Sequence, residues 1–151
     1  MVDTMKALVK HAPEMGARLE QVPIPKPGRG EVLVKVTAAA ICGTDVHIYE
    51  WNPWAAGRIK PPLVFGHEFC GEVVALGEGV EDLALGTRVS AEGHFVCKKC
   101  YFCRTGQGHI CQDVEIIGVD TNGCFAEYVR APRSNIWVLD PEIPTEVAAI
   151  H

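Results

Sequence analysis

Short runs of β-branched and aliphatic residues, each bounded by glycine or proline, recur along the chain. They occupy residues 5–10, 31–36, 71–76 and 88–91. Runs of this length between turn-forming residues are typical of β-strands. Glycine-containing turns are expected at residues 77–79, 86 and 122–123. The pattern predicts a small, mainly β barrel or sandwich with long functional loops.

Helical signals are few. The sequence favours one helix over residues 44–49 and a second over residues 147–150, with Thr145 as its capping residue. Residues 22–28 are rich in proline and cannot donate the backbone hydrogen bonds of a sheet, so we expect an extended connector there. The predicted fold class is mainly β with short helices, in one domain covering residues 1–151.

Composition and charge exclude several classes of function. The chain is 48% hydrophobic and 22% charged, which is the balance of an ordinary globular protein. Its net charge is −5, and no stretch gathers Lys and Arg into a phosphate-binding patch, so no nucleic-acid partner is expected. The N-terminal region is interrupted by charges, and no apolar run is long enough to span a bilayer. We therefore expect a cytoplasmic protein without a membrane partner.

Four of the seven cysteines crowd into one polar segment. Cys97, Cys100, Cys103 and Cys111 form a CxxCxxC pattern followed by a fourth cysteine. This spacing lets four thiolates surround one ion, and four thiolates form the closed shell of a structural zinc site. An iron–sulfur cluster of the bacterial type would continue with a three-residue gap and a proline, whereas Gln112 follows Cys111 here. We predict a structural zinc lobe at about residues 92–113.

A second set of metal-ligand residues lies where predicted strands end at glycine-containing turns. Cys42, His67 and Glu68 offer sulfur, nitrogen and oxygen donors. An incomplete protein shell of this kind leaves a position for substrate or water, as catalysis by zinc requires. Taken singly, each residue has an ordinary alternative: a small core cysteine, a hydrogen-bonded histidine or a solvated carboxylate.

The combination of motifs resembles a known family. The chain has CGTDxH at residues 42–47, GHExxGxV at 66–73, GxRV at 86–89 and the four-cysteine lobe. Together they are similar to the medium-chain, zinc-dependent alcohol dehydrogenases, whose catalytic domain is a GroES-like barrel. The resemblance runs from about residue 6 to residue 150.

The resemblance implies roles for individual residues. Cys42 and His67 would bind a catalytic zinc ion, and Glu68 would bind it directly or exchange with water or substrate. Thr44 and His47 would relay the substrate proton to solvent. Two zinc ions per chain are then expected, one catalytic and one structural. His94, which precedes the cysteine lobe, is a weaker candidate for contact with the substrate.

Within that family, further segments look like the branch that acts on L-threonine. They are residues 41–51, Trp54, residues 58–62, 117–120 and 123–128. This branch oxidises the secondary hydroxyl of L-threonine to 2-amino-3-oxobutanoate with NAD, and its full-length members are expected to be homotetramers. Two alternatives stay open: another polyol or secondary-alcohol dehydrogenase of the butanediol or sorbitol type, and a non-catalytic zinc-binding module.

The chain lacks the glycine-rich turn of a dinucleotide-binding domain. The sequences at residues 28–30 and 77–79 have no third glycine and no following helix, so no cofactor-binding residue is assigned. Because family members continue into such a Rossmann domain, we expect this chain alone to be inactive. His151 stands where the branch continues with an acidic residue and a proline; a ligand role for His151 is disfavoured because a free terminus rarely holds ligand geometry.

Overall fold

The computed structural model describes residues 3–150, so His151 lies outside the described residues. Strands dominate this range. The strands are β1 (Thr4–Lys10), β2 (Arg18–Pro23), β3 (Glu31–Ala40), β4 (Leu63–Val64), β5 (Glu68–Leu76), β6 (Arg88–Ala91), β7 (His94–Phe95), β8 (Glu115–Ile116), β9 (Tyr128–Pro132) and β10 (Ile136–Val138). The α-helices are α1 (Gly43–Glu50), α2 (Pro53–Arg58), α3 (Tyr101–Arg104) and α4 (Thr145–Ala148). The predicted mainly β class is confirmed.

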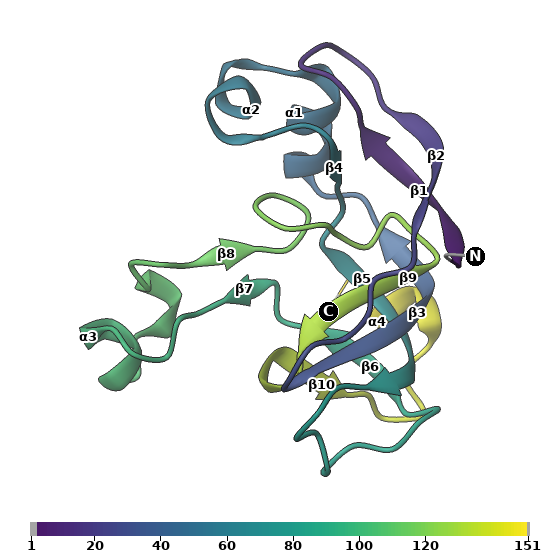
Figure 1. Cartoon of the computed structure of the whole chain (residues 1–151), viewed down its shortest axis with the longest axis vertical. Coiled ribbons are helices and arrows are strands. Elements are labelled where there is room, and N and C mark those ends of the chain that lie inside the picture. The colour runs from purple at the N-terminus through teal and green to yellow at the C-terminus, as the bar shows by residue number, and fades with distance from the viewer. Residues whose placement is uncertain (1–2, 151) are drawn as a thin grey trace.

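A five-stranded antiparallel sheet forms the body of the molecule (Figure 1). Its strand order is β10-β6-β5-β3-β9, so the long strands β3 and β5 lie at its centre. The inward-facing residues of these strands form the main core, together with residues from the following loops. Its fully or nearly fully buried members include Val32, Val34, Phe69, Val73, Val89, Ile117, Val129 and Ala131. Alternating β-branched residues on one face of each strand explain this packing.

A smaller sheet of order β2-β1-β4 lies beside helices α1 and α2 (Figure 1). Ile48 of α1 and Ala55 of α2 belong to a second core cluster, together with Ile59, Leu63 and Phe65. The segment before β9 joins the two sheets, because the Leu8 N–H donates to the Phe125 carbonyl oxygen at 2.7 Å. Buried apolar contacts therefore hold the helices against the smaller sheet, and a backbone link ties that sheet to the segment that leads into β9.

The cysteine-rich segment extends away from both sheets on the two short strands β7 and β8 (Figure 1). Its helix α3 has four residues, none of them buried. Such a segment cannot bury enough apolar surface to offset its conformational entropy, so another interaction must hold it together.

The predicted strands are confirmed, but several elements were not anticipated. β3 continues to Ala40 and β5 starts at Glu68, and both extensions matter for the site. Strands β2, β9 and β10 lack a clean alternating pattern, and α2 is too short for a helical period to be recognised. Thr145 is not the cap of α4: Pro144 occupies the capping position and Thr145 is the first helical residue.

Within residues 3–150, no helix is long and apolar enough to cross a lipid bilayer.

Gly71 keeps β3 and β5 at their observed separation. A Cβ atom at this position would lie 2.2 Å from the Lys35 carbonyl oxygen and 2.7 Å from a Val34 methyl group. The obstructing oxygen belongs to the backbone of the central strand pair, so it cannot move aside without disturbing the register.

We expect Gly71→Ala to lower the free energy of unfolding by at least about 2 kcal/mol, as overpacking in a close-packed sheet does. Gly57→Ala is the control, because a Cβ atom there meets nothing within 4 Å and alanine favours the helix. Urea denaturation followed by circular dichroism measures both variants. Equal stabilities for the two variants would contradict the steric account.

Candidate metal centres

The register of the central strand pair brings together the first set of predicted ligands. β3 and β5 pair with Ala40 opposite Glu68. Cys42 lies two residues beyond Ala40, and His67 immediately precedes Glu68. The ends of two adjacent strands therefore carry Cys42, His67 and Glu68 to the same edge of the sheet.

The donor atoms of Cys42, His67 and Glu68 lie within 4.8 Å of one another, and all three residues are half-buried. One ion can therefore contact a sulfur, a nitrogen and an oxygen atom while a coordination position remains for another ligand. This donor set suits zinc, which accepts all three ligand types. Spatial convergence of the three residues is the geometry that the sequence analysis anticipated.

Three glycines, Gly66 and the two that pack against its backbone, determine the chain conformation just before His67. Gly66 has a positive φ of 91°, and its carbonyl oxygen accepts a 2.9 Å hydrogen bond from the Cys124 N–H. Cβ atoms at Gly118 and Gly123 would lie 2.3 and 2.0 Å from that oxygen. Close backbone approach therefore fixes the direction in which His67 leaves the turn.

Asp45 connects two of the ligand residues and was not identified from the sequence. It lies in the first turn of α1 and is 2% exposed. One carboxylate oxygen accepts the Cys42 N–H at 2.9 Å, and the other lies 3.5 Å from Nδ1 of His67. The spacing of Cys42 and Asp45 is that of a capping box, which is the signal that could have revealed this role.

His67 Nδ1 and Asp45 Oδ1 are both buried and lie 3.5 Å apart, and neither atom has a hydrogen-bond partner among residues 3–150. Hydrogen bonding to Asp45, opposed by burial and assisted by Cys42, raises the pKa of His67 to about 9. A carboxylate that orients one imidazole nitrogen leaves the other free to bind a metal, which is the common outer arrangement around zinc-bound histidine. These residues therefore fit a zinc ion.

The two predicted relay residues lie on α1 beside this cluster. The Thr44 hydroxyl oxygen is 3.9 Å from the Cys42 sulfur, and Thr44 is half-buried. His47 lies one turn further along the helix and is exposed, with its ring centroid 6.3 Å from that of Trp54. The Thr44 hydroxyl near the metal ligands, followed by the solvent-exposed His47 imidazole, offers a route by which a proton can leave the site.

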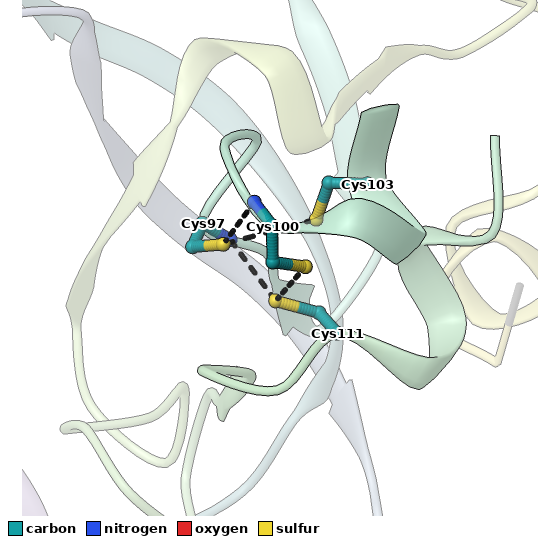
Figure 2. Close-up of side chains that lie close together, drawn as sticks. All are labelled: Cys97, Cys100, Cys103 and Cys111. Atoms are coloured by element: carbon teal, nitrogen blue, oxygen red, sulfur yellow. Dashed lines mark hydrogen bonds between the residues drawn. The ribbon is translucent and has the colours of Figure 1, made fainter. Parts of the chain in front are cut away.

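The four lobe cysteines converge, and their sulfur atoms point toward a common centre (Figure 2). Cys97 and Cys103 sulfurs are 3.9 Å apart, and Cys100 and Cys111 sulfurs are 4.0 Å apart. Four thiolates around zinc at 2.3 Å would be separated by about 3.8 Å in a tetrahedron. Backbone N–H groups of Cys97 and Cys100 also point at ligand sulfurs, at 3.3 and 3.4 Å. The lobe therefore has the geometry of a closed structural site.

The pKa values of two lobe thiols, Cys100 and Cys103, are shifted in opposite directions. Backbone N–H groups of Cys103 and Gln112 lower the pKa of Cys100 to about 6. Desolvation, followed by hydrogen bonding with Cys100 and Cys111, raises the pKa of Cys103 to about 12. Four thiolates so close together repel one another, and a divalent cation removes that repulsion. The donor set thus fits a structural zinc ion.

His94 lies in a different environment from Cys42, His67 and Glu68, which are called the three-ligand cluster below. Its ring nitrogen Nδ1 is 2.6 Å from a Glu92 carboxylate oxygen, and its side chain is 50% exposed. It lines a cavity of about 310 Å³ with Glu92, Asn135 and Trp137. Cys42, His67 and Glu68 do not line this cavity. Contact between His94 and a substrate is therefore not supported by its present neighbours and stays a prediction.

The fold and the two cysteine-containing sites define a class of protein. The family model described as the alcohol dehydrogenase GroES-like domain matches residues 28–141. The chain belongs to this family. The predicted GroES-like architecture and the resemblance to the zinc-dependent alcohol dehydrogenases are thereby confirmed.

Its similar relatives include L-threonine 3-dehydrogenases. The enzyme from Pyrococcus horikoshii is 56% identical over all 151 residues, and that from Bacillus licheniformis is 57% identical over the same length. The chain spans 43% and 44% of the length of these curated relatives, respectively.

Solved structures of longer dehydrogenases contain the same fold. A short chain alcohol dehydrogenase of Escherichia coli CFT073 complexed with NADH has a TM-score of 0.87 at 36% identity, with 97% of this chain and 41% of that chain covered. Galactitol-1-phosphate dehydrogenase of Escherichia coli has a TM-score of 0.87 at 32% identity, covering 96% of this chain and 41% of that one.

We expect Asp45→Asn to weaken zinc binding at the three-ligand cluster by about 10- to 100-fold, the usual effect of removing such a histidine partner. The new amide would present an N–H donor to His67 Nδ1 in place of a carboxylate. Glu50→Gln, an exposed acid on the same helix, is the control. Competition with a chromogenic chelator measures affinity, and equal losses at the four-cysteine lobe would contradict the assignment.

Zinc binding at the three-ligand cluster should weaken as the pH falls. The ion must displace a proton from His67, whose pKa is raised to about 9. Each displaced proton changes the apparent dissociation constant about tenfold per pH unit, so it should rise by at least about 100-fold between pH 8 and pH 6. Chelator competition across this range tests the expectation. A dissociation constant that did not change with pH would exclude displacement of a proton.

Proposed function

We propose that this chain is the catalytic domain of a zinc-dependent dehydrogenase that oxidises the secondary hydroxyl of L-threonine to 2-amino-3-oxobutanoate with NAD. The observation that carries the proposal is the convergence of Cys42, His67 and Glu68 within 4.8 Å. The 56% identity to an L-threonine 3-dehydrogenase over the whole chain supports the substrate. Residues 1–151 form one domain in this proposal, with the zinc lobe at about 92–113.

Two zinc ions per chain are proposed, one at each cysteine-containing site. Cys97, Cys100, Cys103 and Cys111 would hold the structural ion. Cys42 and His67 would hold the catalytic ion, with Glu68 as a third ligand or as a group that exchanges with substrate. When bound, the catalytic zinc supplies a Lewis acid that makes a hydroxyl proton easier to remove.

The remaining steps use residues of this chain. The Thr44 hydroxyl accepts the proton of the substrate hydroxyl and passes its own proton to His47. The exposed imidazole of His47 then releases a proton to solvent. Asp45 keeps the orientation of His67 while the charge of the site changes. NAD would supply the hydride acceptor, and a dinucleotide-binding domain would present it to the substrate.

The proposed substrate class, location and oligomeric state rest on the similarity to L-threonine 3-dehydrogenases. We propose a small-molecule alcohol as the substrate, a cytoplasmic location and a homotetramer for the longer enzyme. The likeness to galactitol-1-phosphate dehydrogenase, at a TM-score of 0.87, supports a polyol as the second candidate substrate. A zinc-binding module without catalytic activity is the remaining alternative.

Joining the remainder of the Pyrococcus horikoshii enzyme after Ile150 should give a protein that reduces NAD with L-threonine. Formation of NADH is measured with L-threonine, 2,3-butanediol, sorbitol and galactitol 1-phosphate. A preference for a polyol would favour the second candidate. A joined protein that binds NAD and two zinc ions yet oxidises no alcohol would exclude the enzyme proposal.

In this joined protein, Thr44→Val should lower kcat by about 10²- to 10⁴-fold, because the proton relay loses its first hydroxyl. Thr4→Val changes an exposed threonine of β1 and should leave kcat unchanged. Steady-state kinetics with zinc content measured in parallel separates loss of the relay from loss of the metal. Full activity in Thr44→Val would remove Thr44 from the mechanism.

A further inference from the structure

Lys10 is a fully buried lysine that the metal sites do not use. Its exposed fraction is 0%, and no ion pair to a carboxylate involves it among residues 3–150. The ammonium group donates to the carbonyl oxygens of Glu14, Gly16 and Tyr49, the last two at 3.0 Å. All three N–H donors of the side chain are therefore used by backbone acceptors.

The three acceptors belong to two different elements. Glu14 and Gly16 lie in the turn between β1 and β2, whereas Tyr49 lies near the end of α1. The Gly16 N–H also donates to the Tyr49 carbonyl oxygen at 2.8 Å, which brings the turn directly against the helix. A cation at the C-terminus of a helix is favoured by the unsatisfied carbonyl groups there.

Lys10 also contacts the residue that ends α1. Its ammonium nitrogen lies 5.0 Å from the centroid of the Trp51 ring, within the range of a cation–π interaction. Trp51 adopts the left-handed conformation, with φ 56° and ψ 47°. The following N–H, of Asn52, donates to the His47 carbonyl oxygen at 3.3 Å. Lys10 is thus connected, through Trp51 and the Asn52 N–H, to the backbone of His47, a predicted relay residue.

Helix α1 is therefore held at both ends by polar contacts. At its N-terminal end Asp45 joins Cys42 and lies beside His67. At its C-terminal end Lys10 holds Tyr49 and Trp51. The helix has eight residues, so a displacement of one end must also move the residues that face the metal ligands.

We infer that Lys10 is a positioning residue, whose ammonium group fixes the helix that Cys42 caps and that carries Thr44 and His47 at the metal centre. The inference rests on the proposed function for the role of those residues. Burial lowers the pKa of Lys10 from its ordinary value, an effect that Glu14 opposes. Without the ammonium group, three carbonyl oxygens would lose their donor in a buried place, which is unfavourable.

The test uses the 151-residue chain with zinc in the four-cysteine lobe and Co²⁺ titrated into the three-ligand cluster. Lys10→Ala should weaken Co²⁺ binding about tenfold and change its absorption spectrum. Propylammonium, which can replace the lost side chain, should restore the affinity to within about twofold. Tetramethylammonium at the same concentration should not, because it has no N–H donor. Lys6→Ala, which removes an exposed lysine from the same strand, is the matched control.

Hydrogen exchange provides a second measurement that needs no metal at the cluster. Exchange of the Trp51 and Asn52 amides should become about tenfold faster in Lys10→Ala and slow again with propylammonium. If Lys10→Ala does not fold, the Co²⁺ affinity and spectrum of Lys10→Met are measured in its place without propylammonium, because the methionine side chain fills the space that the amine would occupy. Lower global stability with an unchanged Co²⁺ affinity and spectrum would overturn the inference, as would a loss that propylammonium does not restore. Failure of the unaltered chain to bind Co²⁺ at the cluster would instead count against the proposed function.

Discussion

The antiparallel pairing of β3 and β5 is the constraint on which the rest of the structure depends. It places Ala40 opposite Glu68 and so sets which residues meet beyond the ends of the two strands. A shift of one residue would turn every side chain to the other face of the sheet. The core prevents that shift, because Val32, Val34, Phe69 and Val73 are buried on one side. Hydrophobic packing thus determines the distance between a thiol and an imidazole that are far apart in the chain.

Much of the fold and site could be predicted from local patterns. The strand class follows from aliphatic runs between glycines, and the lobe follows from the spacing of Cys97, Cys100, Cys103 and Cys111. Both are local in sequence, so neighbouring residues are enough to show them. The convergence of Cys42 and His67 was anticipated only through a likeness to other proteins, because strand register is a long-range property.

Other parts of the structure could not be predicted because they depend on tertiary contacts. The role of Asp45 requires the position of His67, and the role of Lys10 requires Tyr49 to fold back against the β1–β2 turn. From the sequence alone, a lysine on a strand is expected to be exposed to solvent, so the burial of Lys10 could not be predicted. His94 was chosen by position alone, and its neighbours in the structure are Glu92 and Asn135 rather than the three-ligand cluster.

The cysteine lobe and the barrel are stabilised by different interactions, so one can unfold without the other. It is attached through two strands of two residues each, and its short helix buries no residue. If the proposed zinc ion binds there, the order of the lobe depends on the ion that neutralises four sulfur atoms, whereas the barrel depends on its apolar interior. In a zinc-starved cell the lobe would open first, and Lys98 and Lys99 would offer proteases a cleavage site on a molecule whose sheets are still intact. Zinc supply would then govern the lifetime of the polypeptide as well as its chemistry.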